Sequence, residues 1–118
     1  MSLPTFARAM SCAFGGWIVG GAAKYLLDLK ADDLRDIDIL IPHRNWHKAS
    51  RAIPVGTPSN TFGGFKFADH VSGCSIDVWP DDLDRFFAQS NVVPNYAINL
   101  ETYMTIEWHG RVPLTKPT

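Results

Sequence analysis

Short apolar runs and segments with helical periodicity alternate along this chain, and glycine or proline separates most of them. Trp17-Ile18-Val19 is one apolar run, and residues 36–41 alternate acidic and apolar positions as a strand with one polar face does. The pattern predicts helices over residues 4–14, 22–29, 43–53 and 82–88, and strands over residues 17–19, 36–41, 62–68 and 75–79.

The C-terminal part of the chain is harder to interpret. Residues 96–100 fit a strand or a helix, whereas residues 102–108, followed by His109-Gly110 and Arg111-Val112, predict a closing hairpin. Because helices and strands are interleaved and the late strands come as hairpins, we expect an α/β or α+β fold.

Composition is that of a globular protein, with 46% hydrophobic and 19% charged residues in 118 positions. This length predicts one domain over residues 1–118. Every apolar run is too short to span a bilayer, and no secretory signal is visible, so we expect no membrane association. The two cysteines, Cys12 and Cys74, do not form a disulfide framework. We therefore expect reduced thiols and a cytoplasmic location.

The net charge of −1 argues against a surface that binds nucleic acid all round, but the charges are unevenly distributed. Residues 43–66 contain basic side chains and no acid, whereas residues 77–84 contain acids and no base. The basic side chains Arg44, Lys48 and Arg51 lie on a predicted helix, where they are candidates for binding acceptor phosphates. A solvated helix face is the alternative interpretation.

Gly20-Gly21 joins the predicted strand 17–19 to the predicted helix 22–29. Glycine lets the backbone turn sharply and lets an anion approach the amide groups. A helix start directs its free N–H groups to the same place, and Lys24 lies one turn further on. The segment therefore indicates a phosphate cradle or, alternatively, a plain tight turn.

Three aspartates interrupt otherwise apolar strands. Asp36 and Asp38 are two residues apart, so their carboxylates share one face of a strand. Two adjacent carboxylates repel each other unless a cation lies between them, and such oxygen ligands suit Mg²⁺ or Mn²⁺. Asp77 lies in a second apolar strand, and if the two strands are neighbours all three carboxylates converge. The alternative for each acid is a solvent-facing position.

These motifs together resemble the head of the DNA polymerase β-type nucleotidyltransferase superfamily, above all its bacterial CCA-adding and poly(A) polymerase branch. The branch has Gly-Gly-x-x-Arg-Asp followed by Asp-x-Asp, which residues 17–27 and 35–40 resemble. Residues 95–100 are similar to its Asp-Phe-Thr-Ile-Asn-Ala segment, and residues 62–67 with 76–79 to the strand pair that bears its third acid. The resemblance covers most of residues 14–112.

The resemblance implies a nucleotidyltransferase (polymerase β palm-like) fold, with a mixed, mostly antiparallel sheet flanked by helices. It implies two divalent metals and a nucleoside triphosphate such as ATP. The expected reaction transfers a nucleoside monophosphate to a hydroxyl, with an RNA end as the expected acceptor, and releases pyrophosphate. The implied catalytic and metal-binding residues are Asp36, Asp38 and Asp77, and the nucleotide-binding residues are Gly20, Gly21, Lys24 and Asn99.

The chain also departs from the family pattern. Lys24 replaces the family's arginine, Tyr25 replaces the following aspartate, and residues 93–95 replace an Arg-Arg-Asp run. The helical domains that follow the head in CCA-adding enzymes lie outside the resemblance. Two alternatives are therefore retained: a catalytically silent nucleotide- or RNA-binding relative, or subunit, that needs a helical partner, and transfer to a small molecule or protein hydroxyl. Self-association into a homodimer would also cover exposed apolar surface.

Overall fold

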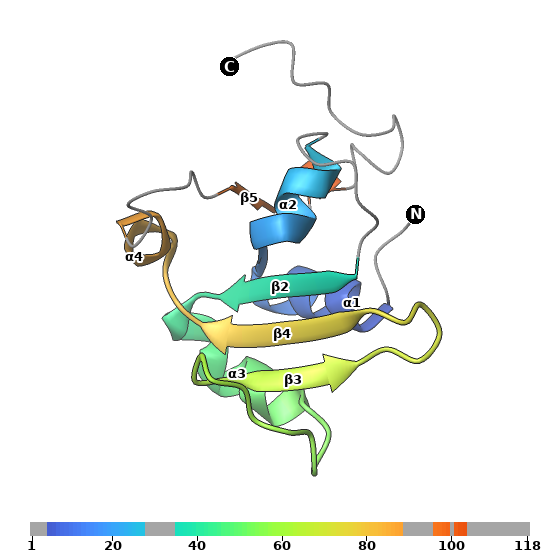
Figure 1. Ribbon diagram of the computed structural model, residues 1–118. Coiled ribbons are helices and arrows are strands. Elements are labelled where there is room, and N and C mark those ends of the chain that lie inside the picture. The colour runs from blue at the N-terminus through green and yellow to red at the C-terminus, as the bar shows by residue number, and fades with distance from the viewer. Residues whose placement is uncertain (1–4, 28–34, 89–95, 100, 104–118) are drawn as a thin grey trace.

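The computed structural model describes residues 5–27, 35–88, 96–99 and 101–103. Within these residues, helices and strands are interleaved along the chain, and only two strands follow each other directly (Figure 1). In chain order they are α1 (Thr5–Phe14), β1 (Trp17–Val19), α2 (Gly20–Leu26), β2 (Asp36–Ile41), α3 (His43–Ala52), β3 (Phe65–Ala68), β4 (Ser75–Pro80), α4 (Leu83–Ala88) and β5 (Ala97–Ile98).

The strands form one five-stranded sheet in the order β3-β4-β2-β1-β5. The β2 and β4 strands pair in parallel, and the other three pairs are antiparallel. A parallel pair needs a crossover connection, and here α3 and β3 lie between β2 and β4 in the chain. The prediction of a mixed, mostly antiparallel sheet flanked by helices is confirmed.

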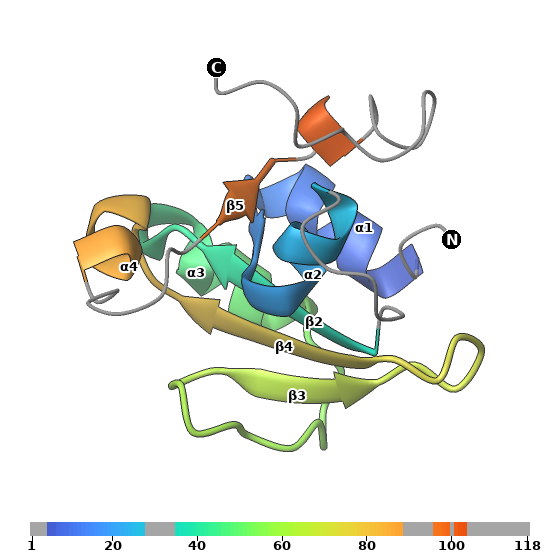
Figure 2. The ribbon, with the colours of Figure 1, turned by 45° about the horizontal axis from the view of Figure 1, so that its top comes forward.

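One face of the sheet forms the hydrophobic core. Ile37 and Ile39 of β2 and Ile76 and Val78 of β4 are completely buried there. Burial of each such side chain contributes about 1.5–3 kcal/mol. Helices α1, α2 and α3 supply the opposing apolar side chains, and Figure 2 shows α1 and α2 against one side of the sheet. The rings of Phe6 and Phe67 stack at 4.2 Å between α1 and β3, and those of Trp46 and Phe65 at 6.1 Å between α3 and β3.

Most predicted elements are confirmed, and the differences at their ends have local causes. Helix α2 starts at Gly20, two residues before the predicted start. Strand β3 starts at Phe65 because residues 61–64 turn instead of extending. Strand β4 continues to Pro80, which is the register partner of Ile41.

The predicted strand over residues 102–108 is wrong at its first two positions. Residues 101–103 are helical, because the Asn99 carbonyl accepts a hydrogen bond from the Tyr103 N–H at 2.9 Å. The Asn99 side chain also accepts a hydrogen bond from the Thr102 N–H at 2.9 Å. The rest of the predicted hairpin lies outside the described residues. None of the helices in the described part of the chain has the length and apolar character needed to cross a bilayer.

Gly64 is a position where a side chain does not fit. A Cβ built there would lie 1.9 Å from the Val78 carbonyl oxygen and 2.7 Å from the Trp79 Cα, and both obstacles are backbone atoms of β4. We expect Gly64→Ala to lower the free energy of unfolding by about 3 kcal/mol or more, since the β3–β4 pair must separate to accept the methyl group. Urea denaturation followed by circular dichroism measures this change.

Gly63→Ala is the matched control. Gly63 has a φ of +86° but open space around its Cβ position, so only backbone strain of about 1–2 kcal/mol is expected. Equal losses in the two variants would contradict the close approach of Gly64 to β4.

Candidate functional site

The register between β2 and β4 brings the sequence-predicted carboxylates onto one face. Asp38 and Asp77 are direct register partners, and Asp36 lies two residues before Asp38 on the same face of β2. All three residues line one open cleft of about 500 Å³. The condition stated from the sequence, that the two acidic strands must be neighbours, is therefore met. The cleft is lined by Asp36, Asp38, Ser59, Asn60, Thr61, Phe62, Lys66 and Asp77.

The Gly20-Gly21 corner lies directly beside this cluster. Val19 is the register partner of Asp38, so the chain turns into α2 immediately after passing the carboxylate. Gly20 has a φ of +66°, and a Cβ there would lie 3.0 Å from Asp38 Oδ2. The backbone conformation therefore favours glycine, and a side chain there would also crowd the Asp38 carboxylate.

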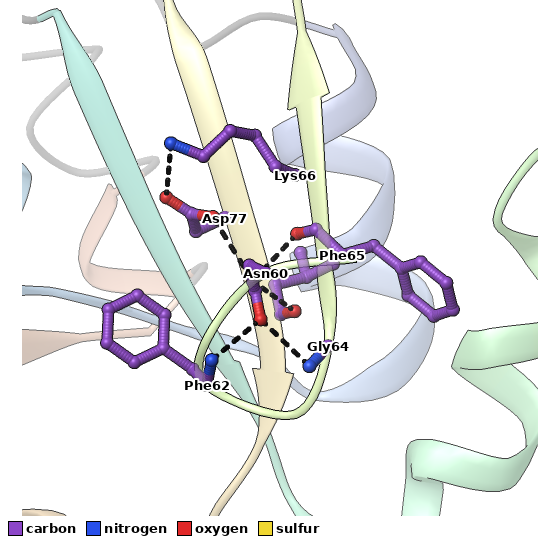
Figure 3. A network of polar contacts seen from close by, with 7 residues as sticks. Asn60, Phe62, Gly64, Phe65, Lys66 and Asp77 are labelled. Carbon is purple, nitrogen blue, oxygen red and sulfur yellow. Dashed lines mark hydrogen bonds and ion pairs between the residues drawn. The ribbon is translucent and has the colours of Figure 1, made fainter. Parts of the chain in front are cut away.

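A side chain that the sequence analysis missed holds the third carboxylate in place. Asn60 Nδ2 donates to Asp77 Oδ1 at 3.1 Å and to the Phe65 carbonyl at 3.0 Å. Its Oδ1 accepts from the backbone N–H groups of Phe62 at 3.0 Å and Gly64 at 2.9 Å. Figure 3 shows Asn60 at the centre of this network. One amide thus shapes the turn before β3 and positions Asp77.

The sequence analysis also did not select Lys66, which lines the same cleft, as a site residue. It is the register partner of Asp77 on β3, and its Nζ lies 3.8 Å from Asp77 Oδ2. A sequence signal for it existed, because Lys66 lies between two inward-facing phenylalanines and so shares the polar face of the β3–β4 pair. Asn60 had no such signal, because a loop position shows no periodicity.

Asp38 has a raised pKa because of its surroundings. Burial, then the Asp77 carboxylate, then the Asp36 carboxylate raise the pKa of Asp38 to about 6, and the Lys66 ammonium opposes them. Asp38 therefore lies where a positive charge is most needed. Carboxylate oxygens in such surroundings are suitable ligands for a hard divalent cation.

The donor set fits a divalent cation at Asp36 and Asp38, whose two carboxylates face the same way from one strand. The described residues include no group of three or more His, Cys, Asp or Glu side chains already arranged to hold a metal ion. Asp77 instead has Asn60 and Lys66 as neighbours. Among the described residues, the acidic pair is thus the part of the cleft with no lysine or arginine at ion-pair distance.

The other predicted site residues do not line this cleft. Lys24 lies in the last turn of α2. The Asn99 side chain accepts the hydrogen bond that starts the turn at residues 101–103. The basic residues of α3 are exposed, and they are Arg44, Lys48 and Arg51. Helix α3 packs through Trp46 on the core face of the sheet, which is the face opposite the one that carries the carboxylates.

The raised pKa of Asp38 predicts a specific dependence of stability on pH. An unfolded aspartate loses its proton near pH 4, whereas folded Asp38 keeps it up to about pH 6. The folded state therefore loses stability as pH rises through this window, and the loss is complete above it. Asp38→Asn removes this effect, so its stability relative to the wild type should increase between pH 4 and pH 7, on the order of 1 kcal/mol after solvent screening.

Urea denaturation of both proteins at several pH values in metal-free buffer measures this difference. Asp84→Asn, an exposed aspartate-to-asparagine change on α4 outside the cleft, is the control. A constant difference between wild type and Asp38→Asn would contradict the raised pKa of Asp38 that burial and the neighbouring carboxylates produce.

The cleft therefore combines an acidic pair with a third carboxylate held by an amide and a lysine, and the Gly20 corner lies beside Asp38. Comparison of the chain with protein-family models, with curated proteins and with solved structures finds no match.

Proposed function

We propose that this chain is a minimal metal-dependent nucleotidyltransferase, with the nucleotidyltransferase fold that its motifs resemble. It would transfer a nucleoside monophosphate from a nucleoside triphosphate to a hydroxyl and release pyrophosphate. The observation that supports this proposal is the pairing of Asp38 with Asp77 in register, with Asp36 on the same face and the Gly20 corner alongside. Acids in one small cleft, with a glycine turn beside them, suit a polyphosphate bound through a cation.

The roles of the residues follow from their places. Asp36 and Asp38 would hold Mg²⁺ or Mn²⁺, which when bound neutralises phosphate charge. Gly20 and Gly21 would let the triphosphate approach the backbone beside Asp38. These residues act by positioning and by charge neutralisation, which provide most of the catalysis in phosphoryl chemistry.

The transfer step requires one bond to form and one to break. The acceptor oxygen bonds to the α-phosphorus while the bond between the α-phosphorus and the bridging oxygen breaks, and that oxygen leaves with pyrophosphate. The acceptor hydroxyl loses a proton. We propose Asp77 as the carboxylate that receives it, since its side chain lines the cleft on the strand next to Asp38.

The acceptor is proposed from the family resemblance, which favours an RNA end. The basic side chains of α3 extend from the other layer of the fold, so an RNA that used them would have to pass around an edge of the sheet. A small molecule or a protein hydroxyl needs no such path. We further propose a cytoplasmic protein, in line with the free thiols of Cys12 and Cys74, that works with a helical partner subunit or as a homodimer.

One observation favours the silent nucleotide- or RNA-binding alternative. Both oxygens of Asp77 have partners within the chain, because Oδ1 accepts from Asn60 and Oδ2 faces Lys66. A carboxylate whose two oxygens already have partners must give up one of these contacts before it can accept a proton. Binding of a nucleoside triphosphate without transfer to RNA, metabolites or protein is the result expected of a silent relative.

We expect Asp38→Asn and Asp77→Asn each to reduce transfer at least about 100-fold, because each removes a charge that the reaction uses. The measurement incubates the purified chain with Mg²⁺, each labelled nucleoside triphosphate, and whole-cell RNA, metabolites and protein, and then separates the products. These three acceptor pools also identify the acceptor class.

Asp84→Asn is the matched control, since Asp84 is an exposed aspartate on α4 that does not line the cleft. It should retain full transfer. Full activity in Asp38→Asn, with its fold confirmed by circular dichroism, would overturn the proposed role of the acidic pair.

A further inference from the structure

Lys66 brings a positive charge into a cleft of three carboxylates. Asp38 on β2, Asp77 on β4 and Lys66 on β3 are successive register partners, so they form one row across three strands. Figure 3 shows the Lys66 side chain reaching from β3 to Asp77. Its Nζ lies 3.8 Å from Asp77 Oδ2, and the Lys66 side chain is 56% exposed. The ammonium is thus both paired and open to the cleft.

The carboxylates in the cleft have unequal surroundings. Asp77 is largely buried and has an amide donor at Oδ1 and an ammonium at Oδ2. Among the described residues, Asp36 and Asp38 have no such hydrogen-bond donor and no lysine or arginine at ion-pair distance. In the part of the chain that the structure describes, a cation at ion-pair distance is therefore present at Asp77 and absent at Asp36 and Asp38.

We propose that Lys66 takes the place of a second metal ion, so that the cleft binds one divalent cation at Asp36 and Asp38 and keeps an ammonium at Asp77. This inference rests on the proposed function and specifies its metal requirement. It replaces the pair of metals that the family resemblance implies.

An ammonium suits this position for two physical reasons. A lysine ammonium is a compact point charge on a flexible stem, so it can contact Asp77 and an anionic phosphate oxygen in turn. Two-metal sites use their second cation to grip and neutralise phosphate oxygens. Lys66 can supply that charge, although it carries one positive charge instead of two.

The test counts the manganese ions bound to the full chain, using electron paramagnetic resonance of free Mn²⁺ during a titration of metal-free protein without nucleotide. We expect one Mn²⁺ in the wild type, still one in Asp77→Asn, and loss of that ion in Asp38→Asn. In Lys66→Met we expect a second Mn²⁺ that depends on Asp77. Mn²⁺ should bind at Asp77 at least tenfold more tightly in Lys66→Met than in the wild type, because the competing ammonium is gone.

Lys48→Met is the matched control, because Lys48 is an exposed lysine on α3 that does not line the cleft. It should leave the count at one. Lys66→Gln is a second variant, which replaces the charged side chain by a neutral polar one. Circular dichroism confirms the fold of each protein.

The outcomes separate this inference from the proposed function. Two Mn²⁺ ions in the wild type, or one in both the wild type and Lys66→Met, would overturn the role of Lys66 and leave the proposed transferase intact. No bound Mn²⁺ in any of the folded proteins would overturn the proposed function, and the inference with it.

Discussion

The parallel pairing of β2 with β4 is the constraint on which the site depends. It makes Asp38 the partner of Asp77, and on the other face it makes Ile37 the partner of Ile76. Because side chains alternate along a strand, a slip of one residue would turn an aspartate into the core and an isoleucine into the cleft. The apolar face therefore enforces the convergence of the carboxylates, and a site with mutual repulsion is stabilised by the core behind it.

The cleft shows how that repulsion is limited. Asp38 keeps a raised pKa, whereas Asp77 has Asn60 on one oxygen and Lys66 on the other. The same Asn60 also orders the turn before β3, where Gly64 approaches the backbone of β4. The turn and the carboxylate are therefore coupled, and a change in one is expected to move the other.

The two layers of the fold separate two kinds of charge. The acids line a cleft on one face of the sheet, whereas the basic side chains of α3 belong to the helical layer on the other face. Their grouping in the sequence indicated a surface for acceptor phosphates, but helix α3 packs its apolar side, through Trp46 and Ala49, on the core. Among the residues that line the cleft, the side chains that can donate hydrogen bonds are those of Ser59, Asn60, Thr61 and Lys66, and of these Lys66 carries a positive charge.

By itself, the sequence determined individual helices, strands and turns, because these follow from local periodicity and turn-forming residues. The alternation of residues 36–41 predicted β2 and the common face of Asp36 and Asp38, and glycine predicted the corner where α2 begins. Only the tertiary structure decided that β4 lies next to β2, that Lys66 reaches Asp77, and that the Asn60 amide binds it. The physical reason is that strand pairing and loop contacts join residues distant in the chain. Which strands pair depends on burial over the whole sheet, and the pattern within one segment does not contain that information.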